Sequence, residues 1–261
     1  MRLPIYQVDA FTDRLFGGNP AAIVPLERWL PDGTMQAIAA ENNLAETAFF
    51  VREGEGYALR WFTPTVEVDL CGHATLAAAY VIFHRLEPRR TEVAFRTLKA
   101  GSLCVKRHGD ALAMDFPSRL GEKATAPAAL AAALGKAPSV VLAARDYLAV
   151  YERQEEVAAL VPDFAALARL DRFAVIVTAP GRDGVDFVSR FFAPAQGIAE
   201  DPVTGSSHCT LAPYWAARLG KKTLTARQIS ARGGDLTCTI ADDRVIIAGR
   251  CVLYLEGAIT V

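Results

Sequence analysis

The chain has 261 residues, of which 52% are hydrophobic, and its formal net charge is −1. This length allows two modest lobes with separate cores. The near-neutral charge and the lack of a basic block argue against a nucleic-acid or anionic-membrane partner, since both need a clustered basic face.

The apolar runs and the cysteines indicate the cellular location of the protein and whether it holds a structural metal. The longest apolar run, 76–83, is far shorter than the ~20 residues that cross a bilayer. Asp9 and Asp13 interrupt the region that a signal peptide keeps apolar. The five cysteines show neither paired short spacing nor a Cys-x-x-Cys pattern, which is typical of reduced thiols without structural zinc. We therefore expect a cytoplasmic protein with no membrane contact and no metal.

The first elements in chain order are two strands and a helix. Strands are expected at 3–9 and 21–24, on either side of the loop 17–20. Asp32 is expected to cap a helix that runs to about Asn42, after which a left-handed asparagine ends it.

Glu46 follows at the point where the chain leaves this helix and enters a strand over 47–51. A glycine turn at 53–56 predicts a hairpin with 57–62. The apolar spacing then predicts a helix from His73 to about residue 85.

The second half repeats this plan after a polar segment, 117–127, which is the best candidate linker. Strands are expected at 175–177 and 185–192, and a helix at 207–219. Antiparallel hairpins with one long helix in each half predict an α+β fold.

Two stretches about 130 residues apart have nearly the same pattern. Residues 60–64 read RWFTP and 69–77 read DLCGHATLA, while 190–194 read RFFAP and 200–212 read EDPVTGSSHCTLA. A period this long exceeds those of solenoid and propeller repeats. It predicts a duplicated domain in which each half carries one strand–turn–helix site.

Each stretch places a glycine, Gly72 or Gly205, where a helix begins. The free N–H groups and the positive end of the helix dipole make such a turn a potential cradle for a carboxylate or phosphate. The structural alternative is that Ser206 is only a helix cap and Gly72 only a tight turn.

Three ionisable residues lie at or near these turns in the predicted fold. Asp201 precedes a proline that keeps its backbone extended. His73 is expected at the first helical position, where the helix dipole lowers its pKa and favours a neutral ring. Glu46, between small neutral neighbours at a strand start, suits a general acid/base. Alternatively, Glu46 is solvated surface and His73 a simple polar cap.

Three motifs in order resemble the PhzF-like phenazine-biosynthesis family: 42–50 (NNLAETAFF), 69–77 and 200–208. The Gly18-Asn19-Pro20 loop belongs to the same pattern, and the resemblance extends from the first strand to the C-terminus. It implies the diaminopimelate epimerase-like fold, with two similar lobes, 1–117 and 118–261, each a barrel-like, mostly antiparallel sheet around a central helix. The last strand can cross over to the first lobe. The active site is expected in the cleft between the lobes.

The resemblance also implies a cofactor-free, metal-free isomerase that moves a proton on a small carboxylate-bearing metabolite. The catalytic residues are then Glu46, as the proton shuttle, with Asp201 and His73. The residues that hold the substrate are Gly72, His73, Gly205, Ser206 and Asn19. The expected assembly is a homodimer.

Two other functions are open. The chain differs from the enzymes that name the family at Ala45, Cys71 and Ala74, so the resemblance does not carry their phenazine substrate over to it. The first alternative is a binding protein without catalysis on the same fold. The second is a racemase with one thiolate base in each lobe, for which Cys71 is in the first position. Pro202-Val203 stands where the second thiol belongs, which disfavours this mechanism.

Overall fold

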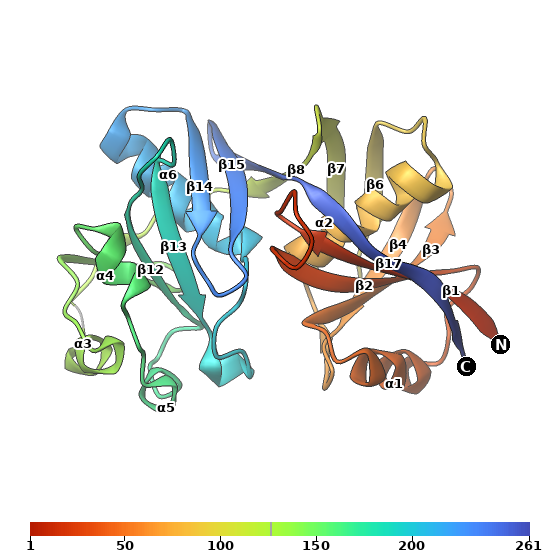
Figure 1. Ribbon diagram of the computed structural model, residues 1–261, viewed down its shortest axis with the longest axis horizontal. Helices are drawn as coiled ribbons and strands as arrows, with labels where there is room; N and C mark the ends of the chain where they lie inside the picture. Colours follow the sequence, from red (N-terminus) through yellow and green to blue (C-terminus); the bar gives the residue numbers. More distant parts are fainter. Residues whose placement is uncertain (126) are drawn as a thin grey trace. The chain divides into compact units, whose positions relative to one another are not determined.

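The computed structural model describes residues 1–125 and 127–261. The chain forms two compact units (Figure 1): Met1–Asp115 with Ala248–Val261 is the first, and Phe116–Ile247 is the second. The predicted α+β class is confirmed, because each unit is a mostly antiparallel sheet that packs on one central helix.

The first unit holds strands from both ends of the chain. Its elements are β1 (Arg2–Ala10), β2 (Asn19–Leu26), α1 (Asp32–Asn42), β3 (Glu46–Glu53), β4 (Gly56–Phe62), β5 (Glu67–Val68), α2 (Gly72–Val81), the π-helix η1 (Ile82–Leu86), β6 (Glu92–Arg96), β7 (Ser102–His108), most of β8 (Ala111–Pro117) and β17 (Cys251–Thr260).

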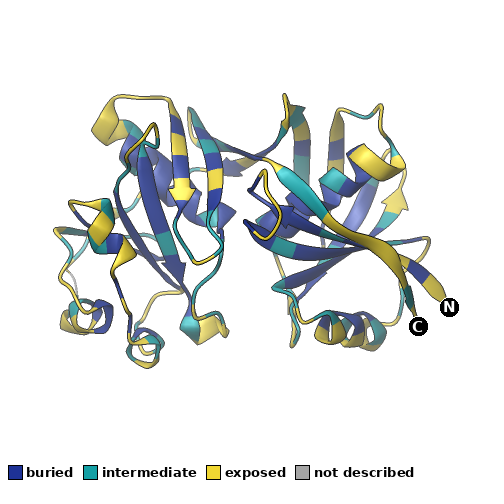
Figure 2. Cartoon of the chain, in the orientation of Figure 1, coloured by how far each residue is buried: buried dark blue, intermediate teal, exposed yellow. Residues whose placement is uncertain are grey.

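Helix α2 is the centre of the first unit. It packs against β1, β2, β3 and β17, and its residues from His73 to Ala79 are all buried. Alanine and other small side chains on every side of this helix let the surrounding strands approach it, as expected for a helix enclosed by a sheet. The outer part of β17, in contrast, is exposed (Figure 2).

The second unit contains the remaining elements. They are β9 (Glu122–Lys123), α3 (Ala128–Leu134), β10 (Val140–Ala143), β11 (Tyr147–Val150), α4 (Gln154–Ala158), α5 (Phe164–Leu167), β12 (Val175–Pro180), β13 (Phe187–Phe192), the 3-10 turns η2 (Pro194–Gln196) and η3 (Gly205–Ser207), α6 (His208–Leu219), β14 (Thr223–Gln228), β15 (Gly234–Ala241) and most of β16 (Arg244–Gly249).

The two units share one strand pairing scheme, as the sequence repeat predicts. In the first, β2 pairs parallel with β3 across α1, β3 pairs antiparallel with β4, and β4 pairs parallel with β6. In the second, β11 pairs parallel with β12, β12 antiparallel with β13, and β13 parallel with β14. Helices α2 and α6 follow the equivalent hairpins.

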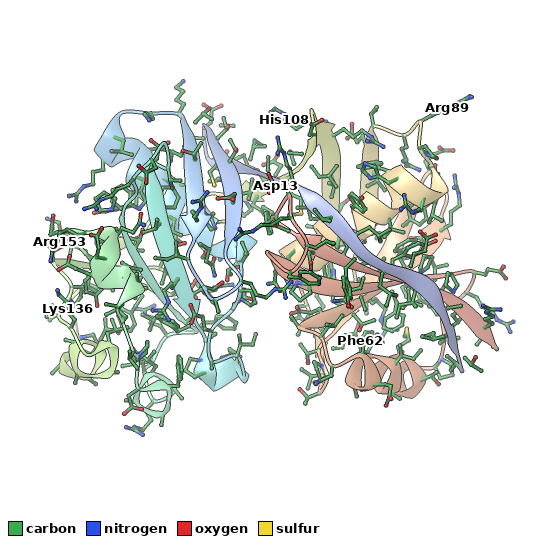
Figure 3. All side chains as sticks on the ribbon, in the orientation of Figure 1. Asp13, Phe62, Arg89, His108, Lys136 and Arg153 are labelled. Atoms are coloured by element: carbon green, nitrogen blue, oxygen red, sulfur yellow. The ribbon has the colours of Figure 1, made fainter. Side chains whose placement is uncertain are left out.

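The matching arginines of the repeat also make matching contacts. Arg60 binds Glu67 through two hydrogen bonds, and its guanidinium lies 5.2 Å from the centroid of the Phe62 ring, labelled in Figure 3. Arg190 binds Glu200 through two hydrogen bonds, and its guanidinium lies 5.0 Å from the centroid of the Phe192 ring. These paired, partly buried ion pairs hold the segment that leads into each glycine turn.

Several local expectations need correction. Pro31, not Asp32, is the N-cap of α1, and Asp32 accepts a hydrogen bond from Arg60 instead. The helix that begins at Gly72 ends at Val81 and continues as the π-helix η1, so His73 is at its second position rather than its first. The left-handed exit of α1 is confirmed at Asn43, whose φ is 49°.

The polar segment 117–127, predicted as a linker, is tied into the second unit where it is described; residue 126 of it lies outside the described residues. Ser118 N–H donates to Asp243 O, and Arg119 N–H donates to Cys209 O. The second bond has a clear cause, because Pro213 inside α6 has no N–H to donate to the carbonyl of Cys209. Across the described parts of the chain, no helix is long and apolar enough to span a membrane.

Candidate active site

Glu46 begins β3, and the neighbouring strand brings Asn19 to the same edge of the sheet. Ala21 of β2 pairs with Glu46, and Asn19 lies two residues before Ala21, on the same face of the strand. Gly18 before it has a φ of +63°, and a Cβ there would lie 2.2 Å from Ala10 O, so only glycine fits this loop. Asn19 and Glu46 are both buried.

His73 and Cys71 come from the start of α2, the central helix of the same unit. Cys71 is the N-cap residue and has an extended backbone. The N–H and the hydroxyl of Thr75 both donate to the carbonyl of Cys71, the latter over 2.6 Å. This pair of bonds fixes the first turn of the helix and therefore the positions from which both side chains start.

Glu46, Cys71 and His73 form a compact buried cluster. Glu46 Oε2 lies 3.1 Å from His73 Nε2, and Cys71 Sγ lies 3.5 Å from His73 Nδ1. The carboxylate and the ring are close but not aligned for a hydrogen bond, so within the described chain Glu46 Oε2 is buried without a hydrogen-bond partner. An acceptor left open in this way has its lone pair available for a proton.

The charges in this cluster differ from the expected ones. Burial disfavours a charged His73 ring, but the neighbouring Cys71 and Glu46 outweigh burial and raise its pKa well above its usual value. The prediction of a lowered pKa at His73 is therefore wrong, because Cys71 and the Glu46 carboxylate both lie within 3.5 Å of a ring nitrogen and raise it. Burial, followed by the charge of Glu46, raises the pKa of Cys71 to about 11.

In the second unit, the turn before α6 is held by hydrogen bonds from hydroxyl, amide and backbone groups. The Thr204 hydroxyl donates to Asp201 Oδ2, and the Ser207 hydroxyl donates to Thr204 O over 2.7 Å. Buried Gln228 at the end of β14 spans the loop: its amide donates to Asp201 O over 2.7 Å and accepts from Thr204 N–H over 2.9 Å. These bonds fix the backbone on both sides of the Asp201 carboxylate.

Ser206 does not cap a helix in this turn. Thr204 is the N-cap of η3 and Ser207 that of α6, and Ser206 lies between them, half-buried. Gly205 beside it is buried. The alternative that Ser206 serves only as a helix cap is therefore wrong.

His208 is the counterpart of His73 and is fully buried. Its Nδ1 lies 2.9 Å from Thr204 O. A carbonyl can only accept, so Nδ1 carries the proton and Nε2 keeps its lone pair. Burial lowers the pKa of His208 to about 4, against the opposing effect of the Thr204 carbonyl, so the ring is neutral at pH 7.

The predicted site residues thus fall into two sets. Asn19, Glu46, Gly72 and His73 belong to the first unit, where the structure brings Glu46 and His73 together. Asp201, Gly205 and Ser206 belong to one loop of the second unit. The cleft shared by both sets stays a prediction.

Sequence reasoning considered Cys71 only as the first thiol of a racemase, and the structure makes it a polar neighbour of His73. It missed a second residue of these sets. Gln228 was not singled out, although the alternation in 223–228 places it on the inward face of its strand with Leu224 and Ala226. A polar side chain on an otherwise apolar inward face was the available signal.

Comparison with known proteins identifies the family. The family model described as phenazine biosynthesis-like protein matches residues 8–257. An uncharacterized isomerase of Pseudomonas aeruginosa is 53% identical over 259 residues, which cover 99% of each chain.

Solved structures agree with this match. The crystal structure of a PhzF-family phenazine biosynthesis protein from Enterococcus faecalis has a TM-score of 0.97 and 48% identity, with 100% of each chain covered. A predicted epimerase from Pseudomonas aeruginosa, 23% identical over 99% of each chain, has a TM-score of 0.77 and so shares the fold. The chain belongs to the PhzF-like phenazine biosynthesis family.

Proposed function

We propose that this protein is an isomerase that moves a proton on a small carboxylate-bearing metabolite, without a cofactor, and that Glu46 is its single acid/base. One observation carries the proposal. The Glu46 carboxylate is buried, its Oε2 has no hydrogen-bond partner in the described chain, and the protonatable His73 ring is 3.1 Å away. A buried carboxylate costs folding free energy, and an open acceptor adds to that cost, which favours a catalytic role.

The other predicted residues have distinct roles in this proposal. His73, as a cation, attracts an anionic substrate and holds the Glu46 carboxylate in place. Asp201 binds an amine or hydroxyl of the substrate from the second unit, in the loop that Gln228 fixes. The N–H groups at Gly72 and Gly205, with Ser206 and Asn19, bind the substrate carboxylate. The protein is proposed to act in the cytoplasm as a homodimer.

The relatives and the thiol chemistry support this reading over the alternatives. The Pseudomonas relative is named an isomerase. A racemase needs a thiolate, and with a pKa of about 11 Cys71 is a neutral thiol at pH 7. A binding protein without catalysis has no need of a buried carboxylate whose oxygen beside a histidine lacks a hydrogen bond.

The test is a screen for deuterium uptake from heavy water into a pool of small carboxylic metabolites. The wild type is expected to label one metabolite or its isomer at carbon. Glu46→Gln keeps the shape of the side chain and removes the proton carrier, so labelling is expected to fall on the order of 10²-fold or more.

Glu55→Gln is the matched control, because it makes the same change on an exposed turn. Circular dichroism checks that both variants fold. Labelling at the wild-type rate in folded Glu46→Gln would show that another group carries the proton.

A further inference from the structure

The cluster around Glu46 contains three different kinds of metal ligand. One ligand atom from each of Glu46, Cys71 and His73 lies within 4.8 Å of the other two, and all three residues are buried. They come from the start of β3 and the start of α2, so no short sequence motif joins them. The sequence spacing of cysteines and histidines alone predicted no site of this kind.

We propose that Glu46, Cys71 and His73 form a binding site for a thiophilic divalent cation, with Zn²⁺ as the physiological ion that fits best. The thiolate, the imidazole Nε2 and one carboxylate oxygen supply three ligands. A water molecule or a substrate group takes the fourth position of a tetrahedral ion.

The distances fit such an ion. Ligand atoms bound ~2.1 Å from a tetrahedral Zn²⁺ lie about 3.4 Å apart, and slightly more when one of them is sulfur. Here Glu46 Oε2 lies 3.1 Å and Cys71 Sγ lies 4.0 Å from His73 Nε2. The thiol and the carboxylate are at most 4.8 Å apart, so rotation about the side-chain torsions draws these two ligands together around the ion.

The open acceptor of Glu46 is an independent observation. At 3.1 Å from His73 Nε2, Oε2 is within hydrogen-bond range but lacks the alignment of one. The lone pairs of two ligands of one ion converge on the ion and not on each other. A close but misaligned pair is therefore what a shared cation requires.

The donor set selects the class of metal. Thiolate and imidazole ligands suit Zn²⁺ and its spectroscopic substitute Co²⁺, whereas Mg²⁺ and Ca²⁺ prefer sites made of oxygen. Zn²⁺ displaces the thiol proton of Cys71 to solvent, as coordination deprotonates thiols outright, and binds the neutral form of His73.

An ion in this site engages the lone pair with which Glu46 carries its proton. Zn²⁺ therefore inhibits the isomerase, and this consequence rests on the proposed function. The binding site itself does not, because metal binding is measured without turnover. The two proposals can therefore fail separately. If the wild type binds zinc at the cluster but turnover survives Glu46→Gln, the proposed function is overturned and the metal site stands.

Cobalt absorption tests the site in the full chain after dialysis against a chelator. Wild type is expected to bind one Co²⁺ per chain, with the intense visible absorption of tetrahedral cobalt and a near-ultraviolet thiolate charge-transfer band, and Zn²⁺ is expected to displace it. Cys71→Ala is expected to lose the charge-transfer band and to bind Zn²⁺ about 100-fold more weakly, at the upper end of the loss seen when a supporting residue of a metal site is removed.

Cys104→Ser is the matched control, since Cys104 also lies beside a carboxylate, Glu92, but outside the cluster. It is expected to keep the band and the affinity. His73→Gln, with its fold checked by circular dichroism, replaces Cys71→Ala if that variant does not fold, and it is expected to lose the tetrahedral spectrum. A wild-type protein without the charge-transfer band, or a band that survives in folded Cys71→Ala, overturns the proposal.

Discussion

His73 and His208 occupy matching places in two units with the same topology, and both are buried, yet their pKa values move in opposite directions. That of His73 is raised and that of His208 is lowered to about 4. Burial lowers both. The neighbours differ: His73 has Cys71 and the Glu46 carboxylate beside it, and His208 has the carbonyl of Thr204.

The comparison teaches that a duplicated scaffold does not duplicate its electrostatics. Because the Cys71 thiol has a pKa of about 11, Glu46 is the anion that acts on His73 at neutral pH. In the second unit, no carboxylate contacts His208 among its described partners, and hydrogen bonds to backbone groups hold the turn instead. One turn is organised around charge and the other around a rigid backbone.

The largest expected effect concerns His208 and acid stability. Its folded pKa of about 4 lies below the usual 6.5, so between these values the unfolded chain binds more protons and the free energy of unfolding falls as the pH falls. The shift corresponds to about 3 kcal/mol. His208→Asn removes this titration. In urea unfolding at several pH values, the free energy of unfolding of this variant is therefore expected to fall less steeply between pH 6.5 and pH 4 than that of the wild type.

The exposed His108, labelled in Figure 3, provides the control. His108→Asn is expected to keep the wild-type fall in the free energy of unfolding. An equal slope in His208→Asn and wild type would contradict the lowered pKa.

The second prediction concerns a variant in which His73, like His208, has no carboxylate beside it in the described part of the chain. Glu46→Gln removes the anion while burial remains, so the pKa of His73 is expected to fall below that in the wild type. Ring resonances of the four histidines, followed by NMR as the pH changes, measure this.

The raised pKa of His73 also sets the sign of its effect on stability. Its contribution is fully present below about pH 6.5 and is lost as the pH rises through the folded pKa. His73→Gln is therefore expected to weaken the decline in stability on the alkaline side. An unchanged His73 titration in Glu46→Gln would show that Glu46 is not the source of the shift.

The third prediction concerns Gln228, the residue that holds the loop of the second unit. Gln228→Ala leaves the buried N–H of Thr204 without its side-chain acceptor and the Asp201 carbonyl without its donor. The expected loss in the free energy of unfolding is about 2 kcal/mol, measured by urea unfolding. Gln36→Ala removes one half-buried bond from the first unit and is expected to cost less. Equal losses in Gln228→Ala and Gln36→Ala would contradict the claim that Gln228 holds the loop of the second unit in place.

The smallest expected effect separates binding from stability at two adjacent serines. Ser206 caps no helix, so Ser206→Ala is expected to leave thermal unfolding unchanged and to raise KM about fivefold, equivalent to about 1 kcal/mol. Ser207→Ala removes a buried donor to Thr204 O and is expected to lower stability. A stability loss at Ser206 as large as that at Ser207 would assign Ser206 a structural role.

Local patterns in the sequence determined the fold class and the duplication. The repeated RWFTP and RFFAP segments, the glycine turns and the strand start at Glu46 are all read from neighbours in the chain, and the structure has each of them. Turn residues and hydrophobic periodicity act over a few residues, which is why they survive without tertiary context.

The chemistry of the site depended on the tertiary structure. The cluster of Glu46, Cys71 and His73 joins a strand to a helix, and the bridge from Gln228 to the Asp201 loop joins residues 27 apart. The pKa of His73 was predicted in the wrong direction, because the helix dipole was visible in the sequence and the carboxylate was not. Short-range electrostatics in a buried site depend on which groups lie within a few ångströms of one another, and only folding brings those groups together.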